Sequence, residues 1–426
     1  MTLLVVVFAA TVILGVPLCF VLGMAGLAHF FTIGNPVYFN VMIQRVFAGI
    51  DNIGLTCIPF FIVAGEIMNA GGVTKELVDF VREIIGFTRG GLAYAAVIMA
   101  AILSAILGSA NAVASILGTV LVPEMIKDGY PDDFSASLVA SGGILGPIIP
   151  PSVTFVFFSV ITGVSVAGLF KAGIIPGICL ALGFAVNIAL YSRFKTKLPK
   201  SDMTFDLRRS ARALVRAIPA LLVPIIIVGG IMGGFFTPTE SGAVSIVAAF
   251  LASVFYRSFD FRKLPGIFVR SAKASAGIFI IIGFGNIMGW SFAIGKIPQV
   301  ISNAIMSVSN SPAVILLIML ALLTFIGCFM EATAAVLIFA PVMMPIAISI
   351  GMDALHFGVI FCIMMTIAFI TPPVGVVLFV TSNITGVSLD RVSKAVIPFA
   401  LTAILITTAL AFLPNVVLFI PKLLGY

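Results

Sequence analysis

The sequence has few charged residues and almost none of the side chains that most catalytic and metal sites use. Only 9% of its 426 residues are charged, and it has two histidines, His29 and His356. The five cysteines stand singly in apolar stretches, with neither the spacing of metal ligands nor a disulfide framework. A histidine-based catalytic or metal centre therefore has almost no residues to use.

Motifs for ATP hydrolysis and for covalent or metal-dependent hydrolysis are missing as well. The sequence has no Walker-type phosphate loop, no nucleophile elbow and no histidine pair at zinc-protease spacing. We therefore expect no enzyme and no organic cofactor. The formal charge of +7 does not indicate a nucleic-acid partner, because the basic residues cluster in a few loops between apolar stretches.

Hydrophobic residues dominate the composition. They make up 61% of the chain, and its mean hydropathy is +1.26. A soluble domain averages about 45–50% apolar and about 25% charged residues. Residues 1–31 are too long and too apolar for a cleaved signal peptide, so we expect them to stay in the membrane. We predict an all-α polytopic membrane protein.

The hydropathy pattern predicts simple spans and two interrupted segments. The spans are 3–31, 53–70, 134–163, 166–192, 213–235, 239–257, 274–296, 356–385 and 395–420. Segments 91–126 and 312–349 carry polar or glycine-rich breaks at their midpoints, and each has the length of a helical hairpin that enters the membrane and returns. Irregular backbone at membrane depth is tolerated only when buried in protein or lining a cavity.

Several motifs occur twice at an offset of roughly 220 residues. Ile-Thr-Gly-Val-Ser stands at 161–165 and again at 384–388, and a double proline precedes each copy, at 150–151 and 372–373. We therefore predict two repeats, 1–192 and 213–426, joined by a basic connector over 193–212. The first comprises scaffold helices in 1–90, a re-entrant hairpin in 91–126 and a broken helix in 134–163. The second comprises scaffold helices in 213–296, a hairpin in 312–349 and a broken helix in 356–385.

The basic loops predict how the chain crosses the membrane. Residues 193–216 hold eight basic residues against two aspartates, which indicates the cytoplasmic side. Counting crossings from there, the first hairpin opens to the cytoplasm and the second to the outside, so the repeats are inverted. Residues 3–31 cross once by hydropathy or twice by symmetry with 213–257; we favour two. Segments 74–88 and 258–272 are amphipathic and form either helices lying in the interface or ordinary loop helices.

The first candidate site combines two interruptions. Gly108-Ser109-Ala110-Asn111 breaks an apolar stretch, where glycine ends one helix and the polar side chains cap the next. Downstream, Gly146-Pro147 and Pro150-Pro151-Ser152 force the helix to unwind. Two unwound segments side by side expose carbonyl oxygens that suit sodium, and the positive ends of the half-helices can face an anion. The alternative is a proline-kinked span beside a packing face.

The second candidate site repeats this pattern and adds a carboxylate. Gly327–Thr333 pairs with Thr371-Pro372-Pro373. An ionisable residue at a hairpin tip is costly, which makes Glu331 a functional candidate unless it reaches interfacial water. Glu66 and Glu240 are interpreted as structural. The predicted sodium ligands are Gly108, Ser109, Asn111, Gly146, Pro150, Gly327, Glu331, Thr333, Thr371 and Pro372, and the predicted substrate contacts are Ser109, Asn111, Ser152, Glu331 and Thr371.

These motifs resemble a known family. The residues that carry the resemblance include Gly65-Glu66-Ile67-Met68-Asn69-Ala70-Gly71-Gly72, Ser141-Gly142-Gly143, Pro150-Pro151-Ser152, Pro238-Thr239-Glu240-Ser241, Met330-Glu331-Ala332 and Thr371-Pro372-Pro373. Along essentially its whole length the chain resembles the large membrane subunit of the tripartite ATP-independent periplasmic (TRAP) transporters, the DctM-like family.

The resemblance implies a sodium-coupled importer of organic acids in a bacterial inner membrane, for C4-dicarboxylates, sialic acid or other sugar acids. It also implies a small four-helix membrane subunit, a periplasmic substrate-binding protein and an elevator mechanism in which hairpins and broken helices move against a scaffold. Ala110-Asn111 departs from relatives that carry further hydroxyl residues there, which leaves the substrate open. The alternatives are a stand-alone sodium/dicarboxylate symporter and an ion channel with two re-entrant loops.

Overall fold

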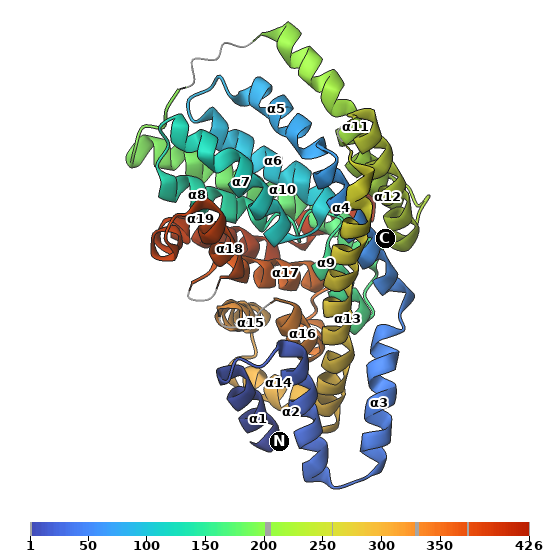
Figure 1. The fold of residues 1–426 in the computed structure, drawn as a ribbon. Helices are drawn as coiled ribbons and strands as arrows, with labels where there is room; N and C mark the ends of the chain where they lie inside the picture. The colour runs from blue at the N-terminus through green and yellow to red at the C-terminus, as the bar shows by residue number, and fades with distance from the viewer. Residues whose placement is uncertain (1, 201–205, 258, 329–331, 373–374, 426) are drawn as a thin grey trace.

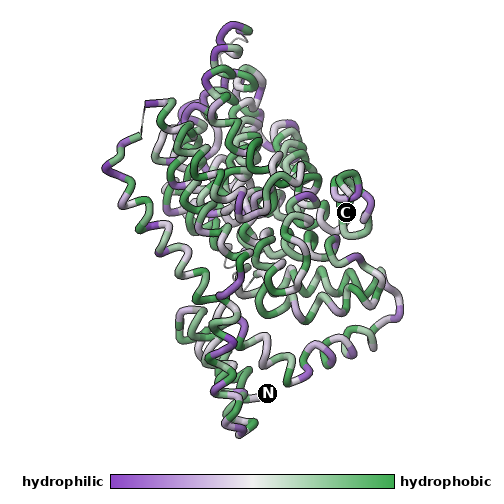
Figure 2. The backbone as a smooth tube through the Cα atoms, turned by 90° about the vertical axis from the view of Figure 1, so that its right-hand side faces the viewer, coloured by the Kyte–Doolittle hydropathy of each residue, from purple (hydrophilic) through white to green (hydrophobic). Residues whose placement is uncertain are grey.

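The described part of the chain is helical, as the sequence predicts. The computed structural model describes residues 2–200, 206–257, 259–328, 332–372 and 375–425. Seven helices within these ranges are long and apolar enough to cross a membrane. Figure 2 shows hydrophobic residues running through the bundle, whereas hydrophilic residues gather mainly toward its ends and loops. These features confirm the predicted multi-pass membrane protein.

The described residues of the first half form ten α-helices and one short 3-10 helix (Figure 1). They are α1 (Thr2–Ile13), α2 (Leu18–Ile33), α3 (Val37–Ile50), η1 (Ile53–Thr56), α4 (Cys57–Ala70), α5 (Val73–Ile85), α6 (Gly91–Leu107), α7 (Ala110–Lys127), α8 (Asp132–Gly143), α9 (Val153–Thr162) and α10 (Val166–Phe194).

The second half repeats the order of hairpin, interrupted helix and long following helix, and differs in the helices around them. Its helices are α11 (Leu207–Met232), α12 (Pro238–Phe255), η2 (Phe261–Lys263), α13 (Leu264–Ile294), α14 (Ile297–Val308), α15 (Pro312–Gly327), α16 (Ala332–Ser349), α17 (Ala354–Ile367), η3 (Ala368–Ile370), α18 (Val376–Thr385), α19 (Leu389–Ala411), α20 (Pro414–Val417) and α21 (Phe419–Leu423).

Residues 3–31 form two helices, which is the arrangement that symmetry favours. Gly15 takes a left-handed backbone (φ 71°) and Pro17 precedes α2, so the chain turns between them. Helices α1 and α2 then pack against each other. The apolar composition continues through this turn, which is why hydropathy alone joins the two helices into one span.

Two other predictions about the scaffold need correction. Residues 258–272 are not a separate interface helix, because α13 begins at Leu264 and continues without a break to Ile294. Residues 37–50, for which no span was predicted, form α3, which packs against α13. The amphipathic segment 74–88 does contain a separate helix, α5, whose apolar face is buried and which packs against α6 and α11.

The repeated pentapeptide has the same local structure in both halves. Gly163 ends α9 and Gly386 ends α18, each in a left-handed conformation, with φ of 77° and 73°. In each copy the serine four residues before the glycine donates a hydrogen bond to the carbonyl of the valine directly after it. A shared sequence therefore produces a shared helix ending, and each ending leads directly into a long helix, α10 or α19.

The two halves interlock through the return arms of their hairpins. Helix α7 packs against α8 of its own half and α18 of the other, and α16 packs against α17 of its own half and α9 of the other. The first segments of both interrupted helices are almost completely buried: every residue from 134 to 143 in α8 and from 355 to 367 in α17. The hairpins and interrupted helices therefore share one core.

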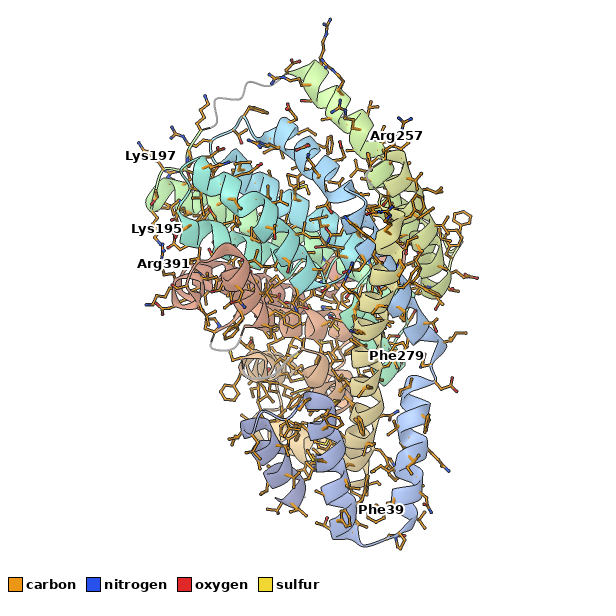
Figure 3. The ribbon with its side chains drawn as sticks, in the orientation of Figure 1. Phe39, Lys195, Lys197, Arg257, Phe279 and Arg391 are labelled. Atoms are coloured by element: carbon orange, nitrogen blue, oxygen red, sulfur yellow. The ribbon has the colours of Figure 1, made fainter. Side chains whose placement is uncertain are left out.

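The basic loops gather toward one end of the molecule. In Figure 3, Lys195, Lys197, Arg257 and Arg391 lie in the upper half of the view, whereas Phe39 lies near the opposite end. Helix α5 and the start of α11, which carry further basic residues, lie at the same end in Figure 1. This distribution agrees with the predicted cytoplasmic side.

Candidate functional site

The first hairpin reverses direction within two residues. Gly108 ends α6 in a left-handed conformation (φ 61°), and Ser109 adopts an extended conformation before α7 begins. A Cβ atom at Gly108 would lie 2.6 Å from the carbonyl oxygen of Pro151. Two features therefore require glycine at position 108: the left-handed backbone conformation and the close approach of the segment that contains Pro151.

The interrupted helix approaches the hairpin tip from the other side. Helix α8 ends at Gly143 and α9 begins at Val153, with irregular backbone and a cis bond between Pro150 and Pro151 in between. A Cβ atom at Gly146 would lie 2.8 Å from the carbonyl carbon and oxygen of Ser109. The structure thus brings together the two unwound segments that the sequence places in one site.

Three helix N-termini converge on the cavity beside this tip. The first turn of α7 contributes Ala110, Asn111 and Ala112, and the first residues of α9 and α18 contribute Val153 and Val376. The side chain of Ser109 forms no capping hydrogen bond, so the first N–H groups of α7 are not capped by it. Helix N-termini carry partial positive charge and unpaired N–H donors, which attract anions.

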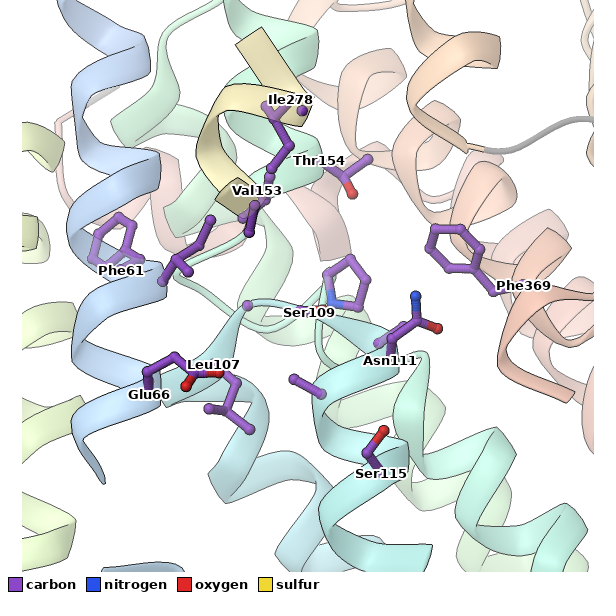
Figure 4. Close-up of a pocket in the computed structure, with 18 of the residues that line it drawn as sticks. Phe61, Glu66, Leu107, Ser109, Asn111, Ser115, Val153, Thr154, Ile278 and Phe369 are labelled. Atoms are coloured by element: carbon purple, nitrogen blue, oxygen red, sulfur yellow. The ribbon is translucent and has the colours of Figure 1, made fainter. Parts of the chain in front are cut away.

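The cavity itself has a volume of about 640 Å³ and mixes apolar and polar walls. Its polar lining residues are Glu66, Asn69, Ser109, Asn111, Ser115 and Thr154. Figure 4 shows Phe61 and Glu66 from α4 on one wall, and Asn111 and Ser115 from α7 on the facing wall. The cavity therefore lies between the predicted scaffold and the first hairpin.

The lining residues also indicate where the cavity leads. Glu66 and Asn69 lie near the C-terminal end of α4, and Ser115 lies on α7 beyond the tip. Ala274 and Gly277 come from the first half of α13, and a Cβ atom at Gly277 would meet open space. All of these positions lie toward the ends predicted to be cytoplasmic, so the cavity extends from the hairpin tip toward that side.

Glu66 is the only ionisable residue among the described residues that line the cavity. Its Oε2 atom accepts hydrogen bonds from Nε and Nη2 of Arg270 on α13, at 2.9 and 2.8 Å. Glu66 therefore has the hydrogen-bond partner expected of a structural residue near a helix end, and it also lines the cavity. Glu240 is structural as well, because it forms a capping box with Thr237 at the start of α12.

Three predicted residues of the first site do not line the cavity. Gly146 lies against Ser109 and Ala110 of the tip, and neither Gly146 nor Pro150 is among the residues that line the cavity. Ser152 is buried, accepts a hydrogen bond from the Phe155 N–H at 3.2 Å and donates one to the Pro147 carbonyl. The Ser152 hydroxyl thus caps α9, and the structure does not place it where a ligand in the cavity would reach it.

The second site is described in part. A Cβ atom at Gly327 would lie 2.5 Å from Cβ of Ala368, so the first arm of this hairpin also touches its interrupted helix. Thr371 has an extended backbone at the end of η3, beside Pro372, and its hydroxyl donates to the Ile367 carbonyl at 2.9 Å. Glu331 and Pro373, and the side chain of Thr333 on α16, lie outside the described residues.

The sequence did not predict the cavity-lining residues that come from distant elements. Phe369 and Val376 belong to the second half but line the cavity of the first site, and Ile278 and Ile281 contribute from α13. Nothing in their local sequence marks them as site residues. Asn69 was detectable, because it follows Glu66 within one of the motifs that carry the family resemblance.

Comparison with known proteins shows the family to which the chain is similar. Residues 5–416 match the family model described as "Tripartite ATP-independent periplasmic transporter, DctM component". The 2,3-diketo-L-gulonate TRAP transporter large permease protein YiaN of Escherichia coli is 34% identical over 95% of this chain and 95% of its own length. The sialic acid TRAP transporter large permease protein SiaM of Vibrio cholerae is 33% identical over 97% and 96%. The C4-dicarboxylate TRAP transporter large permease protein DctM of Pseudomonas aeruginosa is 35% identical over 89% of each.

A solved structure shares the fold. The crystal structure of the Alcanivorax borkumensis YdaH transporter matches with a TM-score of 0.61, covering 88% of this chain and 87% of that one. The sequences are 16% identical over this match, so the likeness concerns the fold alone.

Proposed function

Because the chain belongs to the DctM family of TRAP transporters, a family of bacterial inner-membrane permeases and not of enzymes, we propose that it imports an organic acid by coupling its movement to sodium. The observation that carries this proposal is the convergence of three helix N-termini on one cavity beside a re-entrant tip. Such a site favours an anion.

The cavity supports an anionic substrate without a binding lysine or arginine. Neither residue type occurs among the described residues that line it. The helix N-termini provide partial positive charge, and Asn111, Ser115 and Thr154 provide polar groups for orientation. The substrates named for the three relatives above are all carboxylic acids, which fits this chemistry. Bound cations would supply the remaining charge balance.

We propose sodium as the coupling ion because of the main-chain carbonyl oxygens at the hairpin tip. Carbonyl oxygens of unwound helices coordinate coupling ions in transporters of this architecture. The carbonyl of Pro151 lies against Gly108, and the carbonyl of Ser109 lies against Gly146, so two unwound segments place main-chain oxygens close together. Gly108, Ser109, Asn111, Gly146 and Pro150 remain the proposed ligand region of the first sodium ion.

The mechanism we propose is an elevator. Helices α6–α10 and α15–α19 would move as one body, because each return arm packs against interrupted helices of both halves. Helices α1–α5 and α11–α14 would form the scaffold, and the cavity lies where scaffold and moving body meet. As a component of a tripartite system, the chain would work with a small four-helix membrane subunit and a periplasmic binding protein that delivers the acid.

Uptake by proteoliposomes tests this function. The chain would be reconstituted with its small subunit, and uptake of labelled candidate acids would be followed with and without the loaded binding protein. We expect saturable uptake that needs both an inward sodium gradient and the binding protein. Uptake by this chain alone would instead identify a stand-alone symporter, and large single-channel currents would identify a channel.

A further inference from the structure

The ion pair beside the cavity has a role that goes beyond holding two scaffold helices together. We propose that Arg270 is a specificity-determining residue for anion passage, because it neutralises the Glu66 carboxylate, the one carboxylate among the described residues of the cavity wall. This inference rests on the proposed function, in which an acid crosses this cavity on its way to the cytoplasm.

The geometry places Arg270 next to the path. Ala274, Gly277, Ile278 and Ile281 of α13 line the cavity, and Arg270 lies on the same helical face one turn before Ala274. Arg270 thus extends the cavity-lining face of α13 toward the predicted cytoplasmic end. Its guanidinium reaches across to α4 and holds the Glu66 carboxylate with two hydrogen bonds.

Stability alone does not explain the pair. The side chains of Arg270 and Glu66 are 59% and 34% exposed, and pairs this open to solvent contribute little to folding. Helices α4 and α13 are already joined by packing, and α4 has a further extensive contact with α12. The consequence of the pair therefore lies in the cavity, where it removes a net negative charge from the wall.

The size of the effect follows from Coulomb's law. At an effective dielectric constant of about 20, two like charges about 12 Å apart repel enough to change an equilibrium or a rate roughly tenfold. A bare Glu66 carboxylate would therefore oppose an anion that passes within about this distance of it.

The charge in the cavity can be measured without knowing the substrate. A cysteine introduced by Ser115→Cys, in a background without the five native cysteines, would report from the wall facing Glu66. Its labelling rates with an anionic and a cationic methanethiosulfonate reagent of similar size would be compared. Arg270→Gln should lower the anionic-to-cationic ratio roughly tenfold or more. The double variant Glu66→Gln/Arg270→Gln should restore the ratio to within about twofold of the parent protein.

Uptake measurements on the same variants test the consequence for transport. Arg270→Gln should lower kcat/KM for the acid roughly tenfold, and the double variant should recover most of it, although neither retains the ion pair. A purely structural tie predicts no recovery in the double variant, because both variants lack the ion pair. That result, or an unchanged labelling ratio in Arg270→Gln, would overturn the inference. If the labelling ratios change as predicted but the parent protein takes up none of the acids tested, the proposed function would be rejected instead.

Discussion

Gly108 combines a left-handed backbone with a contact that leaves no room for a side chain. Gly108→Ala should destabilise the protein by roughly 2–4 kcal/mol, about 1 from the backbone and the rest from crowding against Pro151. Gly163→Ala is the matched control, since Gly163 has φ of 77° but open space around its Cβ position. It should cost only about 1 kcal/mol.

Thermal unfolding in detergent, followed alongside uptake, checks this comparison. We expect Gly108→Ala to lower the Tm more than Gly163→Ala does, and to abolish uptake while Gly163→Ala retains it. Equal effects of the two substitutions would show that the tip is not held against the interrupted helix as the structure describes.

Residue chemistry explains which site residues can be predicted from sequence. Ser109 and Asn111 are detectable because polar residues after a glycine are unusual inside an apolar stretch, and both line the cavity. Ser152 has the same kind of sequence signal, but its hydroxyl is used to cap α9. A serine after a double proline serves equally well as a cap or as a ligand, so sequence alone does not separate the two roles.

At the scale of elements, substitutions at two glycines of α13 test which face of this helix lines the cavity. Gly277 and Gly289 both have open space around their Cβ positions, but only Gly277 lines the cavity. Replacing either by leucine should favour the helix by up to about 1 kcal/mol, because glycine is a poor helix former. Gly277→Leu should nevertheless reduce uptake severely by filling the cavity, whereas Gly289→Leu should retain it. Equal uptake by both variants would contradict the assignment of this cavity to the substrate.

A second element-scale prediction concerns the link between α19 and the start of α8. The Arg391 guanidinium hydrogen-bonds to Asp132 and lowers the pKa of that carboxyl below its ordinary value. A lowered pKa means that the pair stabilises the folded protein above the ordinary value of about 3.9 and that this contribution is lost as the pH falls through the folded pKa. Since both side chains are partly exposed, this contribution should be small.

The measurement is the Tm of Arg391→Gln and of the parent protein as a function of pH. The difference between them should stay constant between about pH 5 and 8 and shrink below about pH 4. Lys394→Gln, which removes a more exposed pair with Asp390 on the same helix, should change the Tm less at every pH. A difference that grows on acidification would refute the assignment of the stabilising charge to Asp132.

The elements differ in how far sequence predicts them. The hairpins are predictable because glycine and polar residues interrupt stretches that are otherwise too apolar to hold them. Helix α3 was missed because Asn40, Gln44 and Arg45 lower its hydropathy although it packs along α13. Residues 258–272 were expected to form either an interface helix or an ordinary loop helix because the segment is amphipathic, whereas the chain from Leu264 onward continues without a break as α13.

At the scale of the molecule, repeated motifs predict the order of helices but not the packing between the two halves. Sequence offsets show that α7 and α16, or α9 and α18, are equivalent. They carry no information that α7 contacts α18 and α16 contacts α9, because this exchange depends on the three-dimensional arrangement of both halves. The composite cavity, with α18 contributing to the first hairpin's site, follows from that packing.

We propose that the first hairpin tip and its interrupted helix hold a sodium ion, which can be measured on the purified protein without a substrate. Equilibrium binding of radioactive sodium should be saturable in the parent protein. Ser109→Ala/Asn111→Ala should weaken it markedly, whereas Thr119→Ala, further along α7 and outside the cavity lining, should leave it unchanged. No saturable binding by the folded parent protein, or identical binding curves for the parent and the double variant, would show that this tip does not hold a sodium ion.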